Sequence, residues 1–123
     1  MRYKDGVHLG GMTHATVVAL FECDGIFRDC KIEMLVTSAN DSHSGPLHCN
    51  PDGSCEAFDL RLPSRILASQ RGEPWDEAVS DFDANIFGAI KGAVGSQFDV
   101  ILESHQKNPW RWHIHVEHDP KEG

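Results

Sequence analysis

Two segments of the chain alternate between apolar and polar side chains, and this alternation limits the possible folds more than any other feature of the sequence. Residues 57–62 read Ala-Phe-Asp-Leu-Arg-Leu, and residues 112–118 read Trp-His-Ile-His-Val-Glu-His. Successive side chains of a β-strand point to opposite faces of a sheet, so each segment predicts a strand with an apolar face toward a core. The apolar faces carry Phe58, Leu60 and Leu62 in the first segment and Trp112, Ile114 and Val116 in the second. The polar faces carry Asp59, Arg61, His113, His115 and Glu117.

Further strands are expected at 32–37, which is short and rich in β-branched residues, and at 97–103, which is largely apolar. The polar stretch 104–111 joins the last two strands and predicts an antiparallel hairpin with a long tip. Residues 38–54 are rich in Asn, Asp, Ser, Gly and Pro and predict a long loop. A loop of this length in a compact domain is usually functional.

Two segments have the apolar spacing of amphipathic helices. The first begins after Thr13, a suitable N-cap residue, and runs to about Cys30, where the apolar pattern changes. The second begins at Pro74 and ends at Gly95, a C-terminal stop. Pro63 is expected to end the strand that precedes it.

The order helix, strand, long loop, strand, helix, strand, strand predicts an α+β fold in which an antiparallel β-sheet has helices packed on one face. A length of 123 residues predicts one domain over 1–123. Eleven Lys and Arg against nineteen Asp and Glu give a net charge of −8, which repels nucleic acids and anionic lipids. We therefore expect no nucleic-acid partner, and the oligomeric state stays unknown at this point.

The longest apolar stretch, 15–21, is far shorter than the ~20 residues that span a bilayer, so no membrane insertion is expected. The residues at 1–6 carry charge, but no apolar region and no small-residue cleavage site follow them. This pattern predicts no signal peptide and synthesis in a cytoplasm.

The four cysteines show no Cys-x-x-Cys spacing, which argues against a zinc knuckle or a redox motif. Cys23 and Cys30 are expected to be small buried hydrophobic residues on the first helix. Cys49 and Cys55 bracket a turn-rich stretch that a disulfide would close in an oxidising compartment. Whether they form that disulfide is left open.

Three polar features of the expected fold converge on the sheet face that the helices leave uncovered. They are the loop histidines His43 and His48, the carboxylate of Asp59, and the pair His113 and His115. Imidazole and carboxylate are ligands of catalytic Zn²⁺, which takes three protein groups and a water. A His, Asp, His set therefore makes chemical sense as a metal site.

Each of these residues also has an explanation that needs no metal. The two strand histidines fit a solvated strand face, and Asp59 fits an ion pair with Arg61 or Arg111. The loop histidines fit ordinary surface positions, and Glu103 fits a solvent-facing strand end. The residues alone leave both explanations open.

Four separate segments together resemble the D-alanyl-D-alanine peptidase family of zinc enzymes. This family includes D-Ala-D-Ala dipeptidases and carboxypeptidases, L-alanyl-D-glutamate endolysins and, on the same fold, the hedgehog signalling domain. The similarity extends from about residue 3 to residue 121 and is strongest to small phage-encoded members. The segments are VTSANDSHSGPLH at 36–48, AFDLR at 57–61, FDVILE at 98–103 and HIHVEHDPK at 113–121.

The resemblance implies a site with one Zn²⁺ ion on a fold of the hedgehog and DD-peptidase type. Its ligands would be His48, Asp59 and His115, and Glu103 would act as the catalytic base. His113 would lie beside the metal and hydrogen-bond the oxyanion that develops in the reaction.

The resemblance also implies a function, that of a zinc metallopeptidase acting on the stem peptides of peptidoglycan. The bond cut would be L-Ala-D-Glu, as in endolysins, or D-Ala-D-Ala, as in carboxypeptidases. His43 matches a further loop histidine near the site, and Arg61 is either a salt-bridge partner or a group that meets a substrate carboxylate. A phage endolysin would degrade the host cell wall after its release.

This chain departs from the family in two spacings. Ten residues intervene between His48 and Asp59, and nine between Glu103 and His113, more than in the family in both places. Loop insertions absorb such differences, because each doubling of loop length costs only ~0.6 kcal/mol. Glu117 is the next candidate for the base. The alternatives to a peptidase are a zinc-containing binding module without hydrolytic activity and a plain α+β domain whose histidines are solvated.

Overall fold

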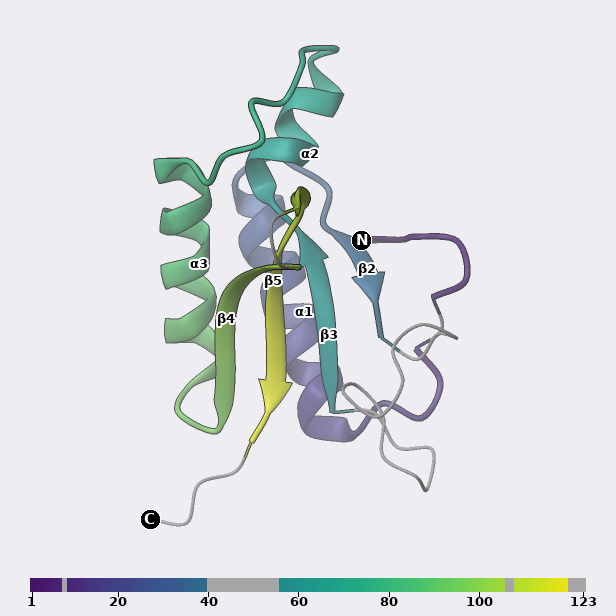
Figure 1. Ribbon diagram of the computed structural model, residues 1–123. Coiled ribbons are helices and arrows are strands. Elements are labelled where there is room, and N and C mark those ends of the chain that lie inside the picture. Colours follow the sequence, from purple (N-terminus) through teal and green to yellow (C-terminus); the bar gives the residue numbers. More distant parts are fainter. Residues whose placement is uncertain (8, 40–55, 106–107, 120–123) are drawn as a thin grey trace.

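The computed structural model describes residues 1–7, 9–39, 56–105 and 108–119, with the backbone alone for 104–105 and 108–111. Within these residues the chain forms a five-stranded mixed sheet and three helices, an α+β architecture (Figure 1). This confirms the α+β class expected from the order of the elements. No helix among the described residues is long and apolar enough to cross a membrane.

The sheet has the strand order β1-β2-β3-β5-β4. Its strands are β1 (Arg2–Tyr3), β2 (Leu35–Ser38), β3 (Ala57–Arg61), β4 (Phe98–His105) and β5 (Asn108–His118). The expectation of a purely antiparallel sheet is wrong for one pair, because β1 runs parallel to β2. Two backbone hydrogen bonds hold this edge strand, from Arg2 N–H to the Met34 carbonyl (2.8 Å) and from Lys4 N–H to the Val36 carbonyl (2.9 Å). A strand of two residues has no periodicity from which the sequence could reveal it.

The hairpin of β4 and β5 is antiparallel, as its sequence predicts. Its strands are longer than expected, because β4 continues to His105 and β5 begins at Asn108 instead of Trp112. The pairing His105↔Asn108 extends the ladder into the stretch assigned to a long tip. Continued pairing satisfies backbone groups that a loop would leave to water, which outweighs the polar composition of this stretch.

The helix α1 (His14–Asp29) follows Thr13 and ends at Cys30, so its predicted limits are confirmed. Cys23 on this helix is fully buried, and burial, with the charges of Glu22 and Asp24, raises the pKa of its thiol to about 12. Cys30 is exposed, which corrects the expectation that both cysteines are buried. Cys49 and Cys55 lie outside the described residues.

The helix α2 (Pro63–Gln70) differs from the expectation from sequence, in which Pro63 only ends the preceding strand. A proline at the first position of a helix loses no hydrogen bond and supplies the required φ angle. The helix α3 (Asp81–Val94) begins after Ser80 and not at Pro74. Ser80 and Asp83 form a capping box, which fixes the start seven residues into the expected helix. Its stop at Gly95 is as predicted.

The core lies between the sheet and the two long helices, which cover one face of the sheet (Figure 1). The apolar residues of the two alternating segments face it, as expected, and all but Trp112 are fully buried. Trp112 is partly buried and packs against the same cluster. The opposite face of β3, β5 and β4 is not covered by a helix (Figure 1). The polar residues of the alternating segments therefore lie on this open face.

A buried carboxylate ties the first turns of α2 and α3 together. Asp83 is fully buried and accepts hydrogen bonds from the backbone N–H of Ser64 (2.7 Å) and of Ser80 (2.9 Å). It also accepts from the hydroxyls of Ser64 (2.6 Å) and Ser80 (3.0 Å). Because α2 directly follows β3, this cluster fixes the end of the strand that carries Asp59.

Candidate metal centre

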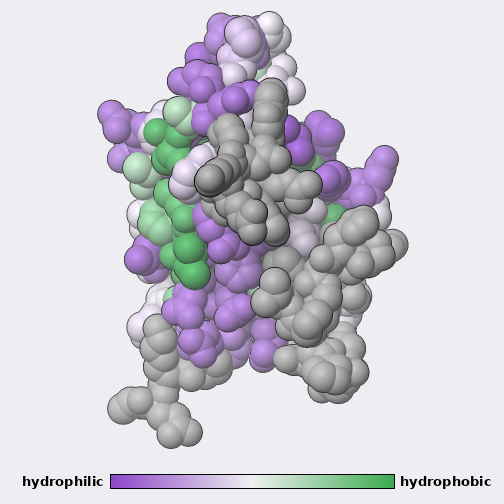
Figure 2. All heavy atoms as spheres, viewed as in Figure 1, coloured by the Kyte–Doolittle hydropathy of each residue, from purple (hydrophilic) through white to green (hydrophobic). Residues whose placement is uncertain are grey.

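The register of the three neighbouring strands brings the polar residues of the open face side by side. Asp59 on β3 pairs with His115 on β5, and His113 on β5 pairs with Glu103 on β4. Arg61 on β3 is the other cross-strand neighbour of His113. Directly opposed residues of antiparallel strands point to the same face, so one patch of the sheet collects all five side chains. Figure 2 shows this face, with hydrophilic surface over β3 and β5 beside a hydrophobic strip over β4.

The side chains in this patch are in contact. Nδ1 of His115 donates a hydrogen bond to Oδ1 of Asp59 (2.7 Å), and Nε2 of His113 lies 3.0 Å from Oε1 of Glu103. Nε2 of His113 also lies 3.6 Å from the same Asp59 oxygen. The side chain of Asp59 is 11% exposed, that of His113 is 20% exposed, and that of Glu103 is 45% exposed. One nearly buried carboxylate thus sits between two imidazoles, and a second reaches them from the solvent side.

Asp59, Glu103 and His113 form a group that could hold a metal ion, because their ligand atoms all lie within 4.8 Å of one another. The donor set of two carboxylates and one imidazole suits a divalent cation. This group shares Asp59 with the ligand set expected from the resemblance. The other two members differ. The group contains His113 and Glu103, whereas the resemblance implies His115 and His48. His48 and His43 lie outside the described residues.

His115 binds to its neighbours through both ring nitrogens. Nδ1 contacts Asp59, and Nε2 lies 3.4 Å from Oε1 of Glu117. Burial alone would lower the pKa of His115. Its carboxylate neighbours outweigh burial and raise the pKa above 6.5, through the hydrogen bond to Asp59, the charges of Asp59 and Glu103, and the contact with Glu117. The carboxylates that favour a positive charge on this ring would favour a bound cation for the same electrostatic reason.

The register explains the unusual spacing between Glu103 and His113. Nine residues separate them in sequence, but the antiparallel pairing of β4 and β5 places Glu103 directly opposite His113. A separation that is long in sequence is therefore one strand spacing in the sheet. The spacing along the sequence does not reveal this contact, but the predicted antiparallel hairpin already places its two strands side by side.

The alternative in which Asp59 forms an ion pair with Arg61 is wrong. Among the described residues, no carboxylate lies within ion-pair distance of the Arg61 guanidinium, and the Asp59 carboxylate contacts both His113 and His115. The other alternative partner, Arg111, has no described side chain. The Asp59 carboxylate thus contacts the imidazoles and not the neighbouring arginine.

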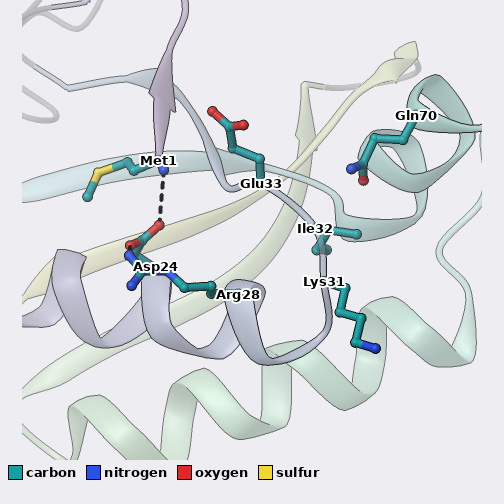
Figure 3. Close-up of a pocket in the computed structure, with 7 residues that line it drawn as sticks. All are labelled: Met1, Asp24, Arg28, Lys31, Ile32, Glu33 and Gln70. Carbon is teal, nitrogen blue, oxygen red and sulfur yellow. Dashed lines mark hydrogen bonds and ion pairs between the residues drawn. The ribbon is translucent and has the colours of Figure 1, made fainter.

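A cavity of 420 Å³ lies away from this patch, between the C-terminal part of α1 and the end of α2 (Figure 3). The carboxylate of Asp24 at its wall is 6% exposed and is paired with the ammonium group of Met1 (3.3 Å) and with Arg28. Its charge is already balanced by these two cations. Among the residues that the structure describes, neither a histidine nor a cysteine lines this cavity.

Comparison with known proteins adds no assignment to these observations, because no family model, no curated protein and no solved structure matches the chain.

Proposed function

We propose that this chain is a zinc-dependent peptidase that hydrolyses amide bonds in peptidoglycan stem peptides, on a fold of the hedgehog and DD-peptidase type. The observation that supports it most is the meeting of Asp59, Glu103, His113 and His115 on the open face of one sheet. The resemblance of four sequence segments to a zinc peptidase family supplies the substrate. The two lines of argument are independent, because the register of the strands does not depend on the resemblance.

Asp59 is the ligand common to both ways of holding the metal. It is joined either by Glu103 and His113, whose ligand atoms are close to it, or by His115 and the loop residue His48. When bound, Zn²⁺ supplies a Lewis acid that polarises an amide carbonyl and activates a water molecule. The low exposure of Asp59 strengthens its attraction for a cation, since water screens the interaction less.

Glu103 is the residue best placed to move a proton. Its carboxylate is 45% exposed and within reach of His113, so it is open to a substrate and still held in position. It would accept a proton from the attacking water and pass it to the leaving amine. His113, with Nε2 on the same patch, would hydrogen-bond the carbonyl oxygen as negative charge develops on it.

Glu117 fits a supporting role better than the role of base. Its carboxylate lies 3.4 Å from Nε2 of His115, on the opposite side of the ring from Asp59. A carboxylate on the second ring nitrogen of a ligand histidine orients that ring and raises its basicity. Glu117 therefore positions His115, which leaves the proton transfer to Glu103.

The test measures zinc content and hydrolysis on the same preparations. Protein purified with zinc should hold about one ion per chain and should release stem-peptide fragments from purified peptidoglycan, identified by mass spectrometry. Glu103→Gln should lower the rate by roughly 10² to 10⁴. Asp99→Asn is the matched control and should keep the parent rate. Asp99 lies on β4 like Glu103, but it pairs with Glu117 and not with His113.

Zinc content then separates two roles of Glu103. A Glu103→Gln protein that keeps its zinc but loses hydrolysis has lost a base, and one that loses both has lost a ligand. A parent protein that binds no zinc, or that binds zinc and releases no fragment, contradicts the proposed peptidase.

A further inference from the structure

The strand β4 forms one edge of the sheet, and β1 forms the other. An edge strand carries backbone N–H and C=O groups without a ladder partner, and proteins usually shorten such strands or place Lys or Pro on them. The strand β1 follows this rule, because it has two residues. The strand β4 does not, because it has eight residues and contains neither Lys nor Pro. It is therefore the long open edge of the described sheet.

The hydrogen bonds around β4 show which of its backbone groups point away from β5. The Gln97 carbonyl accepts a hydrogen bond from the residue that follows β5 (2.8 Å), so Gln97 points toward β5. Backbone groups of an antiparallel strand point to its two sides alternately, so those of Phe98, Val100 and Leu102 point outward. In agreement, Phe98 N–H donates to the Gly95 carbonyl (3.3 Å). Among the described strands, none pairs with the outward groups of Val100 and Leu102.

The side chains at this edge are apolar in the middle and acidic on both sides of it. Ile101 is 46% exposed and lies between Asp99 and Glu103 on the open face. It belongs to the part of the sheet where Figure 2 shows the hydrophobic strip. On the other face, Phe98 and Leu102 are partly buried against the core. An exposed aliphatic side chain beside outward backbone groups favours a partner that is itself a β-strand.

The positions of the acidic residues select the strand that fits. Two copies of β4 can pair antiparallel about a two-fold axis, because an antiparallel edge is self-complementary. An axis at Ile101 would place Asp99 opposite Glu103 of the second copy, and like charges directly opposite destabilise a sheet. An axis at Val100 removes this repulsion, because Asp99 then lies opposite Ile101. Glu103 lies opposite Gln97 of the second copy, whose side-chain amide is a donor. The two copies of Ile101 become diagonal neighbours, about 7–8 Å apart.

We propose that two copies of this chain pair antiparallel through β4, with the two-fold axis at Val100. The two copies of Val100 exchange hydrogen bonds, and Leu102 N–H of each copy donates to the Phe98 carbonyl of the other. An axis at Leu102 would carry the pairing into the irregular stretch after Glu103, whereas the axis at Val100 uses the regular part of the strand. The two sheets become continuous, with both open faces on the same side. Gln97 of one copy then lies beside Glu103 of the other.

Sedimentation velocity at a series of protein concentrations, with EDTA present, measures this pairing in the absence of any metal. We expect a reversible equilibrium between monomer and dimer without larger species, because the other edge of the sheet offers only the two residues of β1. Each copy carries a net charge of −8, so the two copies repel each other at low ionic strength. Added salt screens this repulsion and should strengthen the dimer.

Two substitutions of one exposed side chain test the register. Ile101→Glu places a carboxylate opposite Asp99 of the second copy at two symmetric positions, and should weaken the dimer at least about ten-fold. Ile101→Lys places an ammonium group opposite the same carboxylate, and should keep or increase the affinity of the parent. Val18→Glu is the matched control and should leave the dimer unchanged. Val18 is also an exposed apolar residue (43%), but it lies on α1.

Amide hydrogen exchange of the unmodified protein gives a measurement that needs no variant. The outward amides of Val100 and Leu102 should exchange more slowly at protein concentrations at which the dimer forms, because each then donates to a carbonyl of the second copy. The amides of α1, which already donate within their helix, should exchange at the same rate in monomer and dimer.

Three results would overturn the proposal. The first is a protein that stays monomeric, and the second is a dimer that Ile101→Glu does not weaken, since β4 is then not the contact. The third is a dimer that Ile101→Lys weakens as much as Ile101→Glu, because the residue opposite Ile101 is then not acidic. None of these measurements uses zinc or hydrolysis. The proposed dimer and the proposed peptidase therefore succeed or fail separately.

Discussion

Replacing Asp83 with alanine should remove a large part of the stability of this protein. The side chain is fully buried and accepts four hydrogen bonds, two from backbone N–H groups and two from hydroxyls, all within 3.0 Å. The two hydroxyls can rotate to other acceptors, but the N–H groups of Ser64 and Ser80 are fixed by the first turns of their helices. Asp83→Ala therefore leaves two part-buried backbone donors without their acceptor.

The expected loss follows from this count. A fully buried donor without a partner costs about 1–3 kcal/mol, so about 6 kcal/mol is the upper limit for these two part-buried donors. A domain is stable by about 0.05–0.15 kcal/mol per residue, which for a chain of this length is about 6–18 kcal/mol. Asp83→Ala thus removes up to about a third of the total free energy of unfolding.

Urea unfolding followed by tryptophan fluorescence measures this loss as a fall in the midpoint at unchanged slope. The matched control is Asp81→Ala, which removes an exposed carboxylate from the same first turn of α3 and should cost at most about 1 kcal/mol. If Asp83→Ala costs no more than Asp81→Ala, the buried cluster does not stabilise the junction of α2 and α3, and the reasoning is refuted.

Three further predictions concern the candidate metal centre and β3, the strand that carries Asp59. In the metal-free protein, neighbouring carboxylates raise the pKa of His115 above 6.5, so its contribution to stability is complete below about pH 6.5 and disappears as the pH rises through the folded-state pKa. Urea unfolding of the parent against His115→Gln, from about pH 5.5 to about pH 8.5, should show the difference shrinking, and a constant difference would contradict it. Asp59→Asn should weaken zinc binding at least about ten-fold in a competition with a fluorescent chelator, whereas Asp99→Asn should not. Leu60→Ala, at a fully buried position on β3, should cost about 2–5 kcal/mol of unfolding free energy.

The parts of the fold that the sequence predicts correctly are those in which local pattern and tertiary burial agree. The alternation around Asp59 and His115 reports which side chains face the core, and the structure keeps that assignment. The apolar spacing of α1 also predicts the helix, and Leu20, Cys23 and Phe27 are buried as expected, although Phe21 of the same spacing is 61% exposed. In the two strands, the apolar positions of the sequence pattern are the positions that are buried in the core.

The errors occur where tertiary contacts decide local structure. The capping box of Ser80 and Asp83 sets the start of α3, because Asp83 also binds Ser64 on another helix, which no local pattern reveals. In the same way, β1 exists only as a hydrogen-bonded edge of β2. The ligand group differs from the expected one because cross-strand register, and not distance along the chain, determines which histidine lies closest to Glu103.

The candidate site is therefore positioned by regular structure from both sides. Its carboxylate Asp59 lies on β3, which is hydrogen-bonded to β2 and β5 and is anchored at its end by the Asp83 cluster. Its imidazoles lie on β5, which is paired along both edges. Side chains mounted on paired strands keep their relative positions without a ligand, so little free energy has to be spent on ordering them when a cation or a substrate binds. This preorganisation is the physical reason for seeking the chemistry of this protein on the open face of its sheet.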